Sequence, residues 1–588
     1  MSTRIFHAGG LQFELEGELS GWTIDFQEEV RETGLSILHF ELNSETERSL
    51  PKLALSFRWP QKDIQVRWTP EMPANHHLLP YWWNGGNIVT NLCRNAPVFS
   101  YLNLEGENRI TYAFSEAEQQ VLTHTGPTEN SYLINRIQCF LQPLPPVRKK
   151  RISLRLDRRK IHYSEALHDV SLWYEEILPH PPLPVPAAAR KPVYSTWYQF
   201  QREVTAKQLE QELPVARACG LSTFILDDGW SYAGATVPGT FAHAGDWKAA
   251  SEKFPDMPGH IRKAHQEGMH YLVWFPLPFI GRLAEKDFAR FQGKFLSRGS
   301  HCGVLDPRFP EVRSYLEELY EHFVREWNLD GLKLDFLDNI QLPDPDPAES
   351  DGAGRDYRSL SDAIEALLCG ILTRLRRIKP DLLIEFRQKY IGPAMRTYGN
   401  IFRASDCAMD LLENRVRILD LRLLSGGTAV HSDMLIWSPD DTPEVAALQI
   451  LNVIFATPQI SCMLTRLPDD HRKMLKFWMN FCVSHVRTLQ ESPIRPEHPE
   501  LSYPLVSAEG DKEVITAVYL TGQQIRIHPK KRHIILNAKH SEELLIETGS
   551  PLAIRRFNVF GEEISPESLS AGLQRITVPP SGFALCNN

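Results

Sequence analysis

Two short apolar runs in the middle of the chain each end in a carboxylate. Residues 331–338 read Gly-Leu-Lys-Leu-Asp-Phe-Leu-Asp and contain Asp335, and residues 400–406 end in Asp406. Strands of a parallel sheet are buried on both faces, so a charge is tolerated only where the strand emerges. Two such strands can direct both carboxylates at one pocket. Paired carboxylates on either side of a bond are the usual means of hydrolysing a glycoside.

The segments around these carboxylates alternate between strand and helix patterns from about residue 190 to residue 490. Residues 312–327, 358–377 and 444–457 have helical periodicity. Eight strand–helix units in about 300 residues predict a (β/α)8 TIM barrel. The polar segment 341–356 is predicted to be an exposed loop. The candidate strands are residues 193–200, 222–229, 270–276, 331–337, 382–388, 400–406, 428–433 and 459–464.

Short runs with alternating hydrophobicity on both sides of the predicted barrel indicate two further β domains. Leu11 to Leu15 and Ser36 to Phe40 are typical of an N-terminal antiparallel β-sandwich. Residues 179–186 are rich in proline and form a stiff linker. Similar runs after residue 500 predict a small C-terminal β-sandwich. The expected domains are the N-terminal β-sandwich at 1–185, the catalytic barrel at 186–490 and the C-terminal β-sandwich at 491–588.

Nearly every candidate strand ends in polar or aromatic side chains, and a barrel carries its functional residues at these ends. A single strand-end Asp, such as Asp228 or Asp433, more often caps the following helix. Seven strands that end this way on one face are harder to explain as caps. The candidate substrate contacts among these residues are Asp227, Asp228, Trp230, Trp274, Lys333, Arg387, Arg403 and Asp433.

Lys333 and Asp335 are two residues apart, so both side chains point to the same face of their strand. Leu334 between them faces the helices, which places the other two inside the barrel. A lysine beside an inward Asp335 keeps this carboxylate ionised, as a nucleophile requires. The alternative is a structural ion pair, which is costly to bury and is weak evidence of a role in stability.

The composition is that of a soluble globular protein, and the net charge does not indicate nucleic acid or an anionic membrane as a partner. The 588 residues are 42% hydrophobic and 23% charged, with a net charge of −9. The sequence predicts no secretory signal and no run of about 18 apolar residues that could span a bilayer. The nine cysteines show no zinc-ligand spacing, so we expect buried, reduced thiols, a cytoplasmic location and no metal or cofactor. Homo-oligomerisation is left open.

The ordered motifs of the predicted barrel resemble the α-galactosidases of glycoside hydrolase family 36. The resemblance covers about residues 190–480 and extends to the flanking β-sandwiches. Each motif is weak by itself, but the ordered set is specific. The motifs are Asp227-Asp228-Gly229-Trp230, Gly245-Asp246-Trp247, Lys253-Phe254-Pro255, Trp274-Phe275, Leu305-Asp306, Pro310-Glu311-Val312-Arg313, Lys333-x-Asp335 and Ser405-Asp406.

This resemblance implies a retaining exo-α-glycosidase with Asp335 as nucleophile and Asp406 as acid/base. It assigns Asp227 and Asp228 to sugar hydroxyls, plausibly O4 and O6 of galactose. It also assigns Lys333 to ring hydroxyls and Trp274 to the pocket wall. The implied partner is a small carbohydrate that carries a terminal α-linked galactose. The loop Trp82-Trp83-Asn84-Gly85-Gly86-Asn87 is expected to reach over the barrel mouth, with a place in the core as the alternative.

One segment departs from the family pattern. The family has a Cys-Ser-Gly-Gly-Gly-Arg-like segment before the acid/base strand, whereas this chain has Glu385-Phe386-Arg387-Gln388-Lys389-Tyr390. The cationic Arg387 either recognises a substituent near the 2-position or orients an Asp of the site. The substrate is therefore less well determined than the reaction type.

Other functions remain as alternatives. One is an α-glycosidase or transglycosylase for another hexose, such as N-acetylgalactosamine or glucose. Another is an inactive carbohydrate-binding barrel, which is disfavoured because both Asp335 and Asp406 are present. A metal-dependent barrel hydrolase is disfavoured because the chain has no His-x-His or HExxH pattern.

Overall fold

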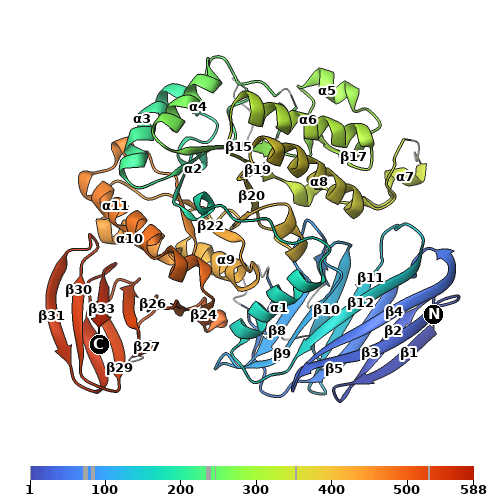
Figure 1. Ribbon diagram of the computed structural model, residues 1–588, viewed down its shortest axis with the longest axis horizontal. Coiled ribbons are helices and arrows are strands. Elements are labelled where there is room, and N and C mark those ends of the chain that lie inside the picture. Colours follow the sequence, from blue (N-terminus) through green and yellow to red (C-terminus); the bar gives the residue numbers. More distant parts are fainter. Residues whose placement is uncertain are drawn as a thin grey trace.

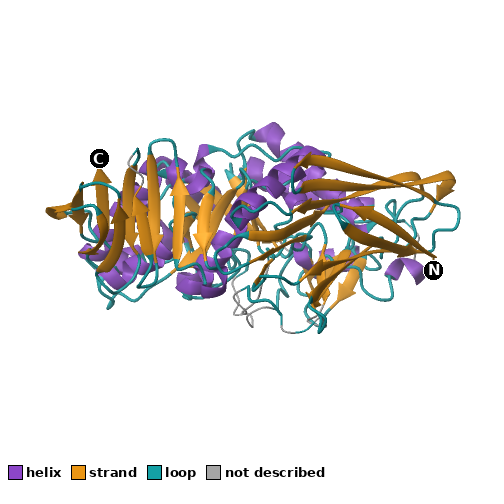
Figure 2. Cartoon of the chain, turned by 90° about the horizontal axis from the view of Figure 1, so that it is seen from below, coloured by secondary structure: helices purple, strands orange, loops and turns teal. Residues whose placement is uncertain are grey.

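The structure, a computed structural model, consists of a central barrel with a β domain on each side (Figure 1). It describes residues 2–70, 77–80, 82, 87–232, 240–245, 247–350, 354–527 and 530–587. Figure 2 shows the strands of the two β domains at opposite ends of the molecule, with helices of the barrel between them. The predicted fold class is confirmed.

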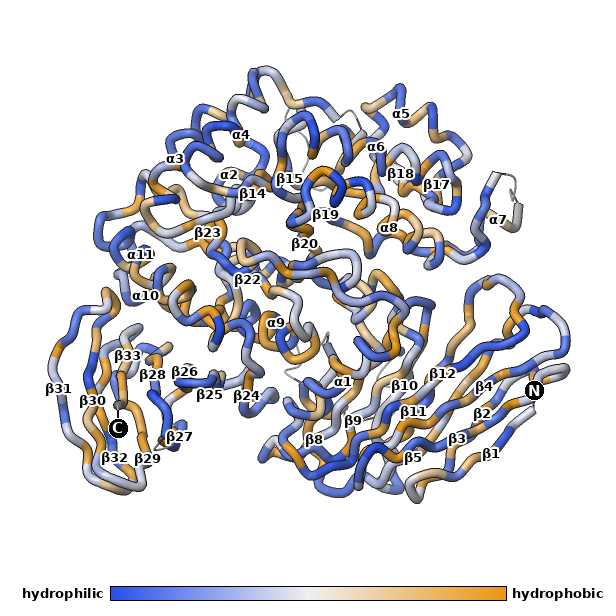
Figure 3. Tube along the Cα trace, viewed as in Figure 1, coloured by the Kyte–Doolittle hydropathy of each residue, from blue (hydrophilic) through white to orange (hydrophobic). Residues whose placement is uncertain are grey.

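The N-terminal domain is a sandwich of two six-stranded antiparallel sheets. The first sheet has the order β1 (Ser2–Ala8), β2 (Leu11–Gly17), β5 (Leu53–Pro60), β11 (Tyr132–Cys139), β10 (Val121–Pro127) and β7 (Asn87–Thr90). The second sheet has the order β3 (Thr23–Glu32), β4 (Leu35–Arg48), β12 (Val147–Asp157), β9 (Asn108–Phe114), β8 (Val98–Leu102) and β6 (Val66–Trp68). Alternate residues such as Phe13 and Leu15 fill the core between the sheets. Figure 3 shows this alternation as changing hydropathy along the strands.

Eight parallel strands close into the predicted barrel, and each overlaps a candidate strand. They are β13 (Val193–Ser195), β14 (Thr223–Leu226), β15 (His270–Pro276), β19 (Gly331–Asp335), β20 (Leu383–Arg387), β21 (Ile401–Arg403), β22 (Ala429–Leu435) and β23 (Thr457–Ile460). The first strand is shorter than predicted because Trp197–Phe200 forms helix α2. The last strand also ends early, at Ile460.

Helices surround the barrel at the predicted positions. The segments predicted at 312–327 and 358–377 are α6 (Pro310–Glu326) and α8 (Leu360–Ile378). The helix predicted at 444–457 is α10 (Pro443–Asn452), which ends earlier because β23 begins at Thr457. The other helices are α3 (Ala206–Ala218), α4 (Met257–Gln266), α5 (Glu285–Arg290), α7 (Pro347–Ser350), α9 (Leu411–Leu424) and α11 (Asp469–Ser484). No helix in the described ranges has the length and apolar character needed to cross a membrane.

In the described part of the loop predicted at 341–356, residues are exposed or partly exposed except for Asp346, and ion pairs anchor two of its side chains. Arg308 binds Asp346 at 2.8 Å, and Arg355 binds Asp306 at 2.8 Å. Asp306 and Arg308 are fully buried beside the small sheet of β16 (Phe279–Gly281), β18 (Cys302–Leu305) and β17 (Phe295–Arg298). Polarity alone predicted exposure, whereas pairing of opposite charges allows Asp346 to be buried.

The C-terminal domain packs a seven-stranded sheet against a three-stranded sheet, as predicted for a small sandwich. The larger sheet has the order β24 (Ile494–Glu497), β25 (Leu505–Glu509), β26 (Glu513–Val518), β28 (Arg532–Asn537), β33 (Phe583–Asn587), β30 (Leu552–Phe557) and β31 (Glu563–Leu569). The smaller sheet has the order β27 (Gln524–Ile527), β29 (Glu543–Thr548) and β32 (Gly572–Thr577). Apolar residues of both sheets, such as Ile535 and Ile546, form the core between them.

A buried carboxylate joins the three domains. Asp420 on α9 accepts hydrogen bonds from Trp68 of the N-terminal domain, at 3.0 Å, and from the hydroxyl of Tyr503, which precedes β25. His77 lies 3.0 Å from the same carboxylate. Helix α1 (Tyr163–Ile177) lies at this junction, between the N-terminal sheets and α9 (Figure 1).

Replacement of Asp420 by Ala should destabilise this junction. The indole of Trp68 and the hydroxyl of Tyr503 would lose a buried acceptor, and each unsatisfied group costs about 1–3 kcal/mol. We expect the melting temperature in a thermal unfolding experiment to fall by several degrees. Asp381→Ala, at an exposed position, is the control and should not change it. An unaltered melting temperature in Asp420→Ala would show that packing alone holds the domains together.

Candidate active site

Strand alternation places the predicted site residues inside the barrel in layers. The floor is apolar and consists of inward residues such as Ile225, Leu272 and Leu383. Two residues further along each strand, the inward side chains become polar or aromatic. In register, Trp274 lies beside Lys333, and Lys333 lies beside Glu385. The barrel therefore has a charged layer above an apolar floor.

Lys333 bonds to Asp227 rather than to Asp335. Its ammonium Nζ lies 2.6 Å from Asp227 Oδ2, and the two side chains are only 4% and 5% exposed. The other oxygen, Asp227 Oδ1, accepts from the backbone N–H of Asp228 at 2.9 Å. The expected inward orientation of Lys333 is therefore present, but its direct partner comes from another strand.

Asp228 lies beside this pair and is held by Arg202. Arg202 Nε donates to Asp228 Oδ2 at 2.7 Å. Burial raises the pKa of Asp228, and the charge of Arg202 only partly opposes this effect. Gly229 follows with φ +109°, and a Cβ there would lie 2.7 Å from Cα of Arg202. The glycine thus permits the close approach of the Arg202 backbone to the end of β14.

Asp335 at the end of β19 accepts hydrogen bonds on both oxygens. Trp274 Nε1 donates to Oδ2 at 2.9 Å, and the backbone N–H of Phe336 donates to Oδ1 at 2.8 Å. Arg387 Nε also donates to Oδ1, and the hydroxyl of Tyr390 lies 3.3 Å from it. Three donors, Trp274, the Phe336 backbone and Arg387, therefore fix the orientation of this carboxylate, because the single proton of the Tyr390 hydroxyl is donated to the carbonyl oxygen of Leu334 at 2.7 Å.

The surroundings of Asp335 favour its ionised form. Burial by itself would raise its pKa, but the positive charges of Arg387 and Lys333 outweigh this effect and hold the pKa below its usual value. The sequence predicted an ionised Asp335 because of Lys333. The structure adds Arg387 as its direct ion-pair partner.

Asp406 lies in the loop after β21 and is 59% exposed. Arg403 Nη2 donates to Asp406 Oδ1 at 3.1 Å. Partial burial raises the pKa of Asp406, but Arg403 and Lys333 outweigh it, so the pKa lies below its usual value. The charge of Asp335 acts in the opposite direction and raises this pKa, so the two carboxylates are close enough to interact.

Arg403 and Asp433 lie behind Asp406. Both side chains are at most 1% exposed, and Arg403 Nη1 binds Asp433 Oδ1 at 2.5 Å. Asp433 Oδ2 also accepts from the hydroxyl of Tyr198 and the backbone N–H of Cys407, both at 2.6 Å. These two residues were predicted as substrate contacts, which stays a prediction, and their hydrogen bonds also support the loop that carries Asp406.

Trp230 was also predicted as a substrate contact, and the structure places it in the core instead. Its side chain is 1% exposed, and its ring centroid lies 5.3 Å from Trp327 and 5.4 Å from Phe275. Its indole Nε1 donates to the carbonyl oxygen of Trp274 at 3.1 Å. Trp230 therefore supports β15 from the side that faces the helices, because the residue after the Gly229 turn points away from the barrel axis.

The sequence analysis missed several polar residues of the charged layer. Glu385 is fully buried and lies 3.1 Å from His431 and 2.6 Å from Gln459 Nε2. His431 in turn lies 2.7 Å from the carbonyl of Ala189, as expected for a satisfied core histidine. Glu385 stands two residues before Arg387, so strand alternation could have identified it as inward.

Part of the predicted lid lies outside the described residues. Residues 83–86 of the loop 82–87 are not described. Asp246 of the separate Gly245-Asp246-Trp247 motif also lies outside the described residues. The N-terminal domain nevertheless contacts the barrel mouth, because the backbone N–H of Asn95 donates to the carbonyl of Lys389 at 2.7 Å. Over the described residues, no group of three or more His, Cys, Asp or Glu side chains could hold a metal ion.

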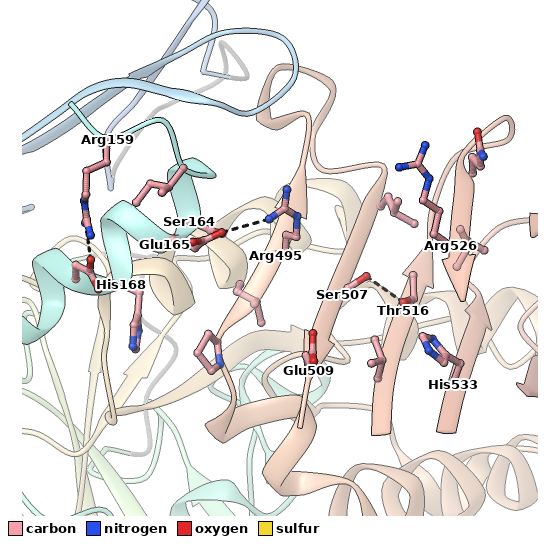
Figure 4. A pocket seen from close by; sticks show the side chains of 18 residues that line it. Arg159, Ser164, Glu165, His168, Arg495, Ser507, Glu509, Thr516, Arg526 and His533 are labelled. Carbon is pink, nitrogen blue, oxygen red and sulfur yellow. Dashed lines mark hydrogen bonds and ion pairs between the residues drawn. The ribbon is translucent and has the colours of Figure 1, made fainter. Parts of the chain in front are cut away.

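A cavity of about 520 Å³ lies away from these residues, between α1 and the C-terminal sheet (Figure 4). Its charged lining is paired within the protein. Arg495 lies 3.4 Å from Glu165, and Arg159 binds Asp169. None of the predicted catalytic or substrate residues lines this cavity, so the candidate active site is the mouth of the barrel.

Comparison with known sequences supports the predicted resemblance. No protein-family model matches the chain. Alpha-galactosidase Mel36A of Lactobacillus acidophilus is 27% identical over 214 residues, which cover 32% of this chain and 26% of that protein. An alpha-galactosidase of Escherichia coli is 25% identical over 215 residues, which cover 34% of this chain and 30% of that protein. The matched part of the chain thus spans less than a third of the length of either relative.

Solved structures share the fold over nearly the whole chain. An alpha-galactosidase from Lactobacillus brevis has a TM-score of 0.64 at 15% identity and covers 99% of this chain and 83% of its own. Another similar structure is a variant of the glycoside hydrolase family 36 alpha-galactosidase AgaA from Geobacillus stearothermophilus in complex with 1-deoxygalactonojirimycin. Its TM-score is 0.64 at 12% identity, and the match covers 99% of this chain and 84% of that chain. The chain therefore shares its overall fold, a barrel flanked by β-sheets, with these solved structures. The resemblance to the α-galactosidases of family 36, predicted from the motifs, is confirmed.

In the ion pair of Lys333 and Asp227, the effect of replacing one partner on the free energy of unfolding should depend strongly on whether the other is present. Lys333→Met leaves a buried carboxylate without its cation and should cost about 3–5 kcal/mol of unfolding free energy. The double variant Lys333→Met/Asp227→Asn should recover part of this loss, as measured by chemical denaturation. The exposed pair of Lys473 and Glu562 is the control, and its cycle should show little coupling. Additive losses at Lys333 and Asp227 would contradict a desolvated ion pair.

Proposed function

We propose that this protein is a retaining exo-α-glycosidase that releases a terminal α-linked galactose. The observation that carries the proposal is the pair Asp335 and Asp406 at the mouth of the barrel. Asp335 ends β19 and Asp406 follows β21, and only β20 lies between these two strands. Asp335 is buried, ionised and held by three donors, whereas the side chain of Asp406 is 59% exposed. This asymmetry suits a fixed nucleophile and an acid/base that must exchange protons.

The proposed reaction has two steps. In the first, an oxygen of Asp335 forms a bond to the anomeric carbon while the bond to the leaving oxygen breaks, and Asp406 gives that oxygen its proton. In the second, a water attacks the same carbon and gives a proton to Asp406, and the bonding pair returns to Asp335 as the carboxylate is released. Each proton and electron pair is restored at the end of the cycle.

Electrostatic coupling supports the change of role of Asp406. In the free enzyme burial raises the pKa of Asp406, Arg403 and Lys333 outweigh this effect and lower it, and the negative charge of Asp335 partly opposes their lowering. Formation of the glycosyl ester removes this charge. The pKa of Asp406 then falls, which favours the base that the second step needs.

The charged layer supports recognition of a hexose. Asp227 with Lys333 and Asp228 with Arg202 present paired oxygens and N–H donors, which suit neighbouring sugar hydroxyls. Trp274 adds an aromatic wall beside Asp335. The structural neighbours include a variant of AgaA in complex with raffinose, which supports an oligosaccharide with a terminal galactose as the substrate class.

The alternatives concern the sugar and the acceptor. Arg387 is 14% exposed and binds Asp335, which supports the orienting role among the two that its sequence position left open. N-acetylgalactosamine or glucose as the sugar, and transfer to another acceptor instead of water, remain the second candidates. All nine cysteines carry free thiols, and the cytoplasmic location stays a prediction.

A panel of p-nitrophenyl α-glycosides that differ at C2, C4 and C6 tests this proposal. We expect the galactoside to be cleaved at least tenfold faster than the glucoside, because an equatorial O4 would leave a buried acceptor unpaired at a cost of about 1–3 kcal/mol. Asp335→Asn should abolish turnover of every member while the protein still folds, because the substitution is nearly isosteric. Equal rates on galactoside and glucoside would refute the galactose assignment, and an active Asp335→Asn would refute the nucleophile.

Asp406→Ala should separate substrates by leaving group. Alkyl galactosides need protonation of the departing oxygen, so their kcat/KM should fall by about 100-fold or more. The activated p-nitrophenyl galactoside should lose far less in the first step, because its leaving group departs without a proton. Steady-state kinetics on both substrates provide the measurement. Equal losses would mean that Asp406 has only a structural role.

A further inference from the structure

Arg387 lies between two carboxylates of the same loop. Its Nε donates to Asp335 Oδ1, and its Nη2 lies 3.8 Å from Asp338 Oδ1, beyond hydrogen-bond distance. Its Nη1 donates to the carbonyl of Gln388 at 2.8 Å. The guanidinium of Arg387 thus donates to Asp335, the proposed nucleophile, and lies near Asp338 without forming a hydrogen bond to it.

Asp338 is incompletely satisfied in this state. Its Oδ1 is buried and has no hydrogen-bond partner among the described residues. Burial raises the pKa of Asp338, Arg387 opposes this shift, and the charge of Asp335 adds to it. A buried carboxylate oxygen without a donor is costly, so Asp338 would gain from a closer approach of Arg387.

The local backbone and the aromatic neighbours permit this approach. Phe336 has φ +64°, and the following 3-10 turn at Leu337–Asn339 brings Asp338 back towards Arg387. The guanidinium carbon lies 4.9 Å from the ring centroid of Phe336 and 5.8 Å from that of Tyr390. The rings favour the cation over their faces without fixing its position between the two carboxylates.

The charges change when the nucleophile reacts. In the first step of the proposed reaction, Asp335 becomes a neutral ester and no longer balances Arg387. The other charged or titratable groups around Asp335 and Asp338 are Lys333, Arg403, Asp406, Lys389, Tyr390 and Cys93. Two acidic members of this group already have partners. Asp406 accepts from Arg403, and the hydroxyl of Tyr390 donates to the carbonyl oxygen of Leu334. Asp338 is therefore the available counter-charge.

We propose that Arg387 is a positioning residue that exchanges partners during catalysis, from Asp335 in the free enzyme to Asp338 in the glycosyl-enzyme. This inference rests on the proposed function, because it requires a covalent intermediate on Asp335. Arg387 orients the carboxylate before attack, and Asp338 stabilises the cation while the ester exists. The departure from the family pattern at Arg387 thus acquires a role together with Asp338.

The test measures formation and breakdown of the intermediate separately. Wild type and Asp338→Asn are treated with 5-fluoro-α-galactosyl fluoride, and labelling of Asp335 is followed by mass spectrometry. After removal of excess reagent, recovery of activity gives the rate of breakdown. Asp338→Asn should slow labelling by about tenfold and should speed recovery, because the intermediate loses a charge-assisted contact. Damage to the fold alone would slow both steps.

Three further variants complete the experiment. Asp338→Glu keeps the charge and should restore part of the labelling rate. In an Arg387→Met background, Asp338→Asn should have no further effect on labelling, because the cation it serves is absent. The matched control is Asp381→Asn, which should behave as wild type. Asp381 is exposed and lies just before the N-terminal end of β20, whereas Arg387 lies at its C-terminal end.

The outcomes distinguish the inference from the proposed function. A wild-type enzyme that is never labelled would overturn the proposed function and the inference with it. A labelled wild type, with both steps slowed or both unchanged in Asp338→Asn, would overturn the exchange of partners alone. Thermal melting of every variant establishes that folded proteins are compared.

Discussion

Compensation of buried charge inside a closed barrel is the constraint on which this active site depends. A barrel interior is normally filled by apolar side chains, and the floor here follows that rule. The next layer contains Lys333 with Asp227 and Arg403 with Asp433, each pair almost fully buried. Such pairs are weak contributors to stability but costly to break, so each partner must stay in place once the other is present. The barrel thus holds charges rigidly where a sugar would need them.

The same electrostatic arrangement gives the two proposed catalytic carboxylates, Asp335 and Asp406, different surroundings. Asp335 is surrounded by donors and by the cation of Arg387, which makes it a stable anion with a fixed orientation. Asp406 has one direct cationic partner, Arg403, and remains largely open to solvent. Arg403 is bonded to the buried Asp433, so the position of Asp406 also depends on a residue that it does not contact directly. Similar carboxylic acids acquire different chemistry because their surroundings differ.

The flanking domains contribute to the mouth of the barrel as well as to stability. Asn95 of the N-terminal sandwich bonds to the backbone of Lys389, two residues after Arg387. The buried Asp420 connects the same domain to α9, whose N-terminal end follows the loop that carries Asp406. The loops on both sides of the site are therefore braced by contacts between domains.

The sequence by itself determined the eight barrel strands, the two β domains and the strand ends that carry Asp335 and Asp406. These features follow from local periodicity and from the rule that charge appears where a buried strand emerges. Only the tertiary structure decided the partners of these charges. Lys333 bonds to Asp227 instead of Asp335, Arg387 bonds to Asp335, and Trp230 points into the core. Barrel closure and strand register bring together side chains that are far apart in the chain, and no local pattern encodes which of several inward charges will meet.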